Sequence, residues 1–115
     1  MTRQEIINLI GDVIYDVNSL MTEQDRGPDW NRLEDVSESL YFYQRKLIKN
    51  SFELNTDKLR GLAKELGEVN KEIQGTIDKV GKFSETLDTM AKFVGVVENL
   101  LQALGVALAG LVLGK

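Results

Sequence analysis

The sequence contains no cysteine, no histidine and only one proline, Pro28, in 115 residues. Without cysteine it has no disulfides, thiolate metal sites or cysteine nucleophile, and a reducing compartment is expected. Without histidine it lacks the usual general base near neutral pH, the commonest metal ligand and the usual partner of a serine nucleophile. These two absences favour a protein that is not an enzyme.

Several binding signals are missing as well. The net charge is -4 and no basic stripe is present, so nucleic acid is not an expected partner. No phosphate-binding glycine loop or zinc-ligand spacing occurs, so no cofactor and no small-molecule substrate are expected. The start of the chain runs directly into an amphipathic pattern, unlike a secretory signal, and a cytoplasmic location is expected, with the option of membrane association.

The first half of the chain predicts two amphipathic helices. The first spans about residues 3–21, after Thr2 and Glu5 at capping-box spacing. A turn-rich stretch containing Pro28 separates it from a second helix over about 29–50. Both helices carry one apolar stripe and therefore need a packing partner.

The second half carries a heptad repeat, which predicts a long helix over about 56–92 with one apolar seam. The seam residues are Leu59, Leu62, Leu66, Val69, Ile73, Val80, Phe83, Leu87 and Met90. Thr76 is the one polar residue in this series, and a threonine there is expected to bond a carbonyl one turn back. A seam of this kind is typical of self-association, and a homo-oligomer is the expected partner state.

The pattern then blurs into an apolar stretch over 93–113, into which the long helix either continues or bends. An unbroken helix of about 55 residues would be about 80 Å long, far longer than either of the first two helices. We therefore expect a kink or break near Gly81 or Gly95. The predicted fold is all-α, a single domain over 1–115 formed by a helical hairpin or a bundle of three to four helices.

The apolar stretch itself has three interpretations: a helix buried in a core, a segment that engages membrane lipid, or one that fills a partner's groove. Its apolar ridge is formed by Phe93, Val94, Val97, Leu101, Leu104, Leu108 and Leu111. Only 16 uncharged residues separate Glu98 from Lys115, fewer than the roughly 20 of a membrane-spanning helix. A pore-former-like module that stores this stretch in its core and exposes it later is the membrane alternative.

Acidic residues on two predicted helices offer an alternative of another class. Glu34, Asp35 and Glu38 are spaced to share one helical face, as are Glu85 and Asp88, and Mg²⁺ prefers carboxylate oxygens. This spacing resembles that of the all-α nucleotide pyrophosphohydrolases. The resemblance covers these few residues and implies a magnesium-dependent hydrolase built on Glu34, Glu38, Glu85 and Asp88. The primary prediction remains a non-enzymatic helical protein that acts through self-association, with the apolar C-terminal stretch as its working part.

Overall fold

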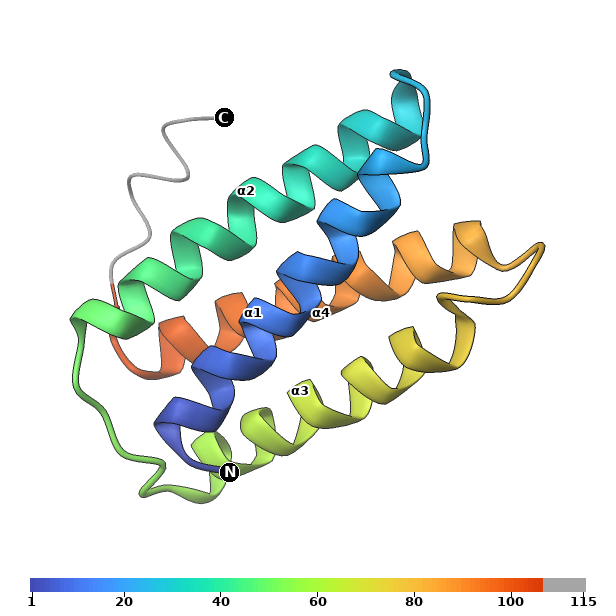
Figure 1. The fold of residues 1–115 in the computed structure, drawn as a ribbon. Coiled ribbons are helices and arrows are strands. Elements are labelled where there is room, and N and C mark those ends of the chain that lie inside the picture. The colour runs from blue at the N-terminus through green and yellow to red at the C-terminus, as the bar shows by residue number, and fades with distance from the viewer. Residues whose placement is uncertain (107–115) are drawn as a thin grey trace.

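The computed structural model describes residues 1–106, and over this range the fold is all-α, as predicted. Its helices are α1 (Arg3–Thr22), α2 (Pro28–Lys49), α3 (Asp57–Thr76) and α4 (Phe83–Ala103). They form a four-helix bundle without a strand in the described range (Figure 1). α1 and α2 form one antiparallel hairpin, α3 and α4 form a second, and α2 runs alongside α4.

The starts of three helices follow from local sequence. The Thr2 hydroxyl accepts a bond from the Glu5 N–H at 3.2 Å, and the Glu5 carboxylate accepts one from the Thr2 N–H at 2.9 Å, a complete capping box. The Thr2 backbone bond, followed by the Thr2 side chain, lowers the pKa of Glu5. Pro28 occupies the first turn of α2, and the Thr56 hydroxyl caps α3 by accepting from the Leu59 N–H at 3.1 Å.

The predicted long helix over 56–92 is broken near Gly81, one of the two positions at which a kink or break was expected. α3 ends at Thr76 and α4 begins at Phe83, with Gly81 at φ +82° in the turn between them. Only glycine adopts such a positive φ without strain, so the helix cannot continue through this residue. Gly95 lies in the interior of α4.

The turn also corrects the heptad interpretation at one seam residue. Val80 lies in the turn and is 102% exposed, so its place in the seam is wrong. The heptad count continues across the turn in the sequence, whereas the helix does not. Thr76 lies at the end of α3 and bonds the Ile73 and Glu72 carbonyls at 3.3 and 3.4 Å, as expected for a threonine in a helix.

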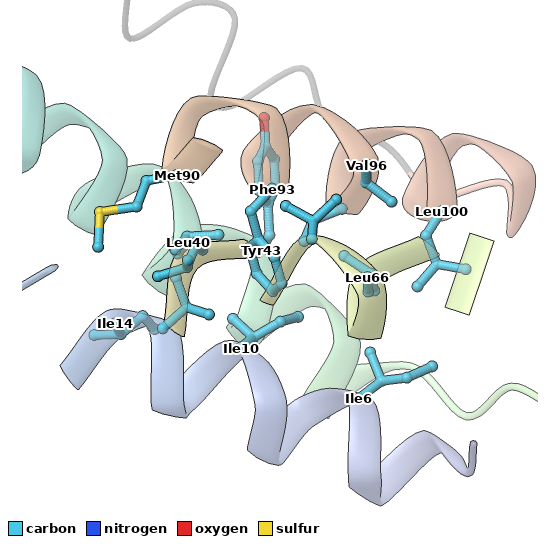
Figure 2. Close-up of a cluster of buried hydrophobic side chains, with 14 of the residues drawn as sticks. Ile6, Ile10, Ile14, Leu40, Tyr43, Leu66, Met90, Phe93, Val96 and Leu100 are labelled. Carbon is cyan, nitrogen blue, oxygen red and sulfur yellow. The ribbon is translucent and has the colours of Figure 1, made fainter. Parts of the chain in front are cut away.

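All four helices contribute to one apolar core. Figure 2 shows Ile6, Ile10 and Ile14 of α1 facing side chains of α2, α3 and α4. Tyr43 of α2 and Phe93 of α4 are the largest fully buried side chains. The stripes of the first hairpin and the seam of the second therefore cover each other within a single chain.

Candidate association site at the end of α4

Most of the predicted seam lies in the core. Its buried members are Leu59, Leu66, Val69, Ile73, Leu87 and Met90. Leu62 and Phe83 are partly buried against the same core. In this fold the seam is covered by the chain's own helices, so these side chains do not form a free surface for a second copy.

The first part of the apolar ridge in the C-terminal stretch is also buried. Phe93, Val97 and Leu101 are fully buried, and Val94 and Leu104 are partly buried. Leu108 and Leu111, the last two members of this ridge, lie outside the described residues. The first interpretation, a helix buried in a core, therefore holds for residues 93–101. Membrane lipid and a partner's groove remain as interpretations only for the residues that follow.

α4 ends at Ala103, inside the predicted helix over 93–113, of which residues 107–113 lie outside the described residues. Gly105 has φ +77°, its N–H bonds the Gln102 carbonyl at 3.0 Å, and the Val106 N–H bonds the Leu101 carbonyl at 3.0 Å. This pair of bonds is a Schellman motif, which satisfies the last carbonyls and redirects the chain. The only sign of this motif in the sequence is Gly105 itself, because glycine is the usual residue at the position with positive φ after a helix end.

A depression of about 280 Å³ lies where the chain leaves α4. It is lined by Lys46, Asn50, Ser51, Phe52, Leu104, Gly105 and Val106. The end of α2, the following loop and the end of α4 thus meet at one site. We call this depression the C-terminal site, and residues 107–115, which lie outside the described residues, the C-terminal segment.

Arg3 fixes one wall of the C-terminal site. Its guanidinium donates to the Leu47, Ile48 and Asn50 carbonyls at 3.1, 2.8 and 3.2 Å, and it lies 5.8 Å from the centre of the Phe52 ring. A cation at the C-terminal end of a helix is favoured because the unpaired carbonyls there carry partial negative charge. The wall is therefore tied to the start of α1. Sequence reasoning missed this role, because nothing in the spacing of Arg3 and Leu47 indicates that they meet.

The one charge in the described apolar part of α4 has a specific partner. The Tyr43 hydroxyl donates to the Glu98 carboxylate at 2.6 Å, joining α2 to α4. Burial, followed by the hydrogen bond and negative charge of Glu98, raises the pKa of the Tyr43 hydroxyl above its ordinary value of 10.0. The pair holds the bundle together, and a phenol with a raised pKa is a poor general base near neutral pH.

The acidic residues proposed for magnesium do not form a metal site in the described part of the chain. Residues 1–106 hold no group of three or more acidic side chains arranged to bind a metal ion. Asp88 instead forms an ion pair with Arg32 at 3.1 Å, which again links α4 to α2. The ammonium of Lys92, one turn after Asp88 on α4, lies 3.3 Å from the carboxylate of Glu72 on α3.

Among the described helices, none combines the length and the hydropathy needed to cross a bilayer. Comparison of the chain with protein-family models, with characterised proteins and with solved structures found no match.

Proposed function

We propose that this chain is a non-enzymatic association protein, a four-helix bundle that joins other copies of itself through its apolar C-terminal segment, residues 107–115. The observation that carries the proposal is the end of α4. The core uses most of the seam and residues 93–101, and the Schellman motif at Gly105 then ends α4 before the apolar sequence does.

The sequence of this segment suits association better than membrane spanning. Residues 107–115 read Ala-Leu-Ala-Gly-Leu-Val-Leu-Gly-Lys. Nine residues cover about 14 Å as a helix, less than half of the roughly 30 Å of a bilayer core. A span extended toward the N-terminus would require residues 93–101 to leave the core, exposing Phe93 and its neighbours to water or lipid.

The apolar side chains of this segment supply enough free energy for assembly. Burying one leucine or valine side chain contributes about 1.5–3 kcal/mol, and the segment carries Leu108, Leu111, Val112 and Leu113. Association costs on the order of 4–15 kcal/mol, which the buried leucine and valine side chains of two such segments can offset. We therefore expect assembly that depends on concentration.

Sedimentation velocity over a concentration series tests the proposal. Measured in about 1 M NaCl, where the Debye length is about 3 Å, contacts between charged surfaces are screened and apolar association remains. The full chain is expected to form oligomers, and the variant Leu108→Gln/Leu111→Gln to remain a monomer with unchanged helical circular dichroism. Val80→Gln is the matched control, because it also replaces an exposed aliphatic side chain but lies in the turn after α3.

Two outcomes overturn the proposal. One is a full chain that stays monomeric at every concentration, and the other is a double variant that assembles as well as its parent. Flotation with phosphatidylcholine vesicles adds a separate arm. A monomeric full chain that floats with vesicles, and whose double variant does not, reassigns the segment to lipid binding.

A further inference from the structure

The exposed face of α2 carries charges that are divided by sign. Its outward residues follow steps of four and three, which place them in one row along the helix: Asn31, Asp35, Glu38, Phe42, Arg45 and Lys49. We call this row the α2 stripe. Phe42 is partly buried and the other five are exposed. Acids precede Phe42 and bases follow it, and the neighbouring Glu34 and Lys46 repeat the division.

This face has no partner among the described helices. α2 packs against α1 and α4, and Figure 1 shows α2 at the outside of the bundle with no described helix on its outer side. Within residues 1–106, neither the acids nor the bases of the α2 stripe form an ion pair. The four exposed charges of the α2 stripe are therefore available to a second molecule, while the ammonium of the neighbouring Lys46 lies 5.3 Å from the centre of the Phe42 ring.

Helix stability alone does not explain the division. Glu34 with Glu38, and Arg45 with Lys49, are like charges four residues apart, an arrangement that destabilises a helix by a few tenths of a kcal/mol per pair. The helix dipole favours acids at the start and bases at the end, but its effect fades beyond one turn. Glu38 lies well inside α2, where the dipole gives no reason for its charge.

We propose that the α2 stripe binds the α2 stripe of a second copy, with the two helices antiparallel about a two-fold axis at Phe42. Glu38 precedes Phe42 by four residues and Arg45 follows it by three, while Asp35 and Lys49 are each seven residues away. Reversing one helix therefore places the acids of each copy opposite the bases of the other. The same patch on both copies forms the contact, as two-fold symmetry requires.

This interface is distinct from the C-terminal site and differs from it in its response to salt. Its attraction is electrostatic and falls as salt screens exposed charges, whereas apolar association persists. The test uses the full chain carrying Leu108→Gln/Leu111→Gln, so that the C-terminal segment adds no association. Sedimentation equilibrium measures its dimerisation in about 0.02 M salt, where the Debye length is about 20 Å and exposed charges still attract one another.

Charge exchange gives the sharpest test. Asp35→Lys/Glu38→Lys makes the whole stripe basic, and Arg45→Glu/Lys49→Glu makes it acidic. Each double variant is expected to lose at least about tenfold in dimerisation constant, because four attractive contacts become repulsive. An equimolar mixture of the two is expected to form a heterodimer, and the variant with all four changes to dimerise like its parent.

The matched control is Glu65→Lys/Glu68→Lys on α3, which changes the net charge as Asp35→Lys/Glu38→Lys does. It is expected to dimerise at least as well as the parent. A parent that remains monomeric at about 1 mM, where even weak transient pairs associate, overturns the proposal. So does an unmixed double variant that dimerises like the parent, or a mixture that fails to form the heterodimer.

Discussion

At the scale of single residues, the pair Tyr43 and Glu98 explains how a charge is tolerated in the most apolar helix. The sequence places Glu98 among apolar residues, where it argues against membrane insertion and fits a core only with a partner. The Tyr43 hydroxyl is that partner, at 2.6 Å. No local sequence pattern indicated this pair, because Tyr43 and Glu98 are 55 residues apart.

Tyr43→Phe is expected to lower the free energy of unfolding by about 1–3 kcal/mol at neutral pH, since it removes a hydrogen bond to a charged acceptor. Urea unfolding followed by circular dichroism measures the loss. Tyr41→Phe is the control, because the Tyr41 side chain is 44% exposed and its hydroxyl accepts only a bond from Asn18, at 3.3 Å, within the described chain.

The raised pKa of Tyr43 sets the pH dependence of this difference. In the unfolded chain the hydroxyl titrates near its ordinary value of 10.0, and in the folded chain it titrates at higher pH. The contribution of the protonated hydroxyl is therefore complete below about pH 10 and is lost as the pH rises through the folded-state pKa. The stability difference between the parent and Tyr43→Phe is expected to be constant near neutral pH and to shrink above about pH 10. A difference that does not change up to about pH 11 would contradict this assignment.

At the scale of helices, the sequence predicted which side chains each helix buries better than it predicted the position of the turn between α3 and α4. The starts of α1, α2 and α3 follow from Thr2, Pro28 and Thr56, whose effects are local. Gly81 was only one of two candidates for the break. The heptad spacing continues through both Gly81 and Gly95, and the choice between them depends on how the two halves pack, which is not local information.

The two glycines are expected to respond oppositely to alanine. Gly95→Ala is expected to raise the free energy of unfolding by about 0.5–1 kcal/mol, because the helix interior favours alanine and a Cβ there meets nothing within 4 Å. Gly81→Ala is expected to lower it by roughly 1–2 kcal/mol, since φ is +82° at that turn. Urea unfolding of both variants checks the pair. Equal effects of the same sign would contradict a turn at Gly81.

At the scale of the whole molecule, stability depends on contact between the two hairpins. The Tyr43 bond to Glu98 and the Arg32 bond to Asp88 both cross from α2 to α4, and the core contains side chains of all four helices (Figure 2). Neither hairpin can cover its own apolar face alone.

Phe93→Ala tests this dependence. Phe93 is fully buried, and its truncation is expected to cost about 3–5 kcal/mol, a large share of the roughly 5–15 kcal/mol that stabilises a typical domain. Val80→Ala, in the exposed turn, is expected to leave stability unchanged. Thermal unfolding of the two variants compares them directly. Leu66→Ala serves as the reference for a buried seam residue. If Val80→Ala lowered the free energy of unfolding as much as Leu66→Ala, Val80 would belong to the buried seam and the turn would be contradicted.

The candidate site was only partly predictable at this scale. The apolar character of residues 93–114 indicated the region of the site. It did not indicate that α4 ends before Gly105, because that depends on how many turns of α4 pack against α2 and α3. The wall formed by Arg3 joins positions 44 or more residues apart in sequence, so no local pattern indicated it.

The glycine that ends α4 also makes the protein modular. The end of this helix is set by residues up to Val106, because the Gly105 and Val106 N–H groups bond the Gln102 and Leu101 carbonyls. A different peptide grafted after Val106 would start at the same depression, which Phe52 lines, and would be carried by the same bundle. Such a graft is expected to leave the four-helix architecture unchanged.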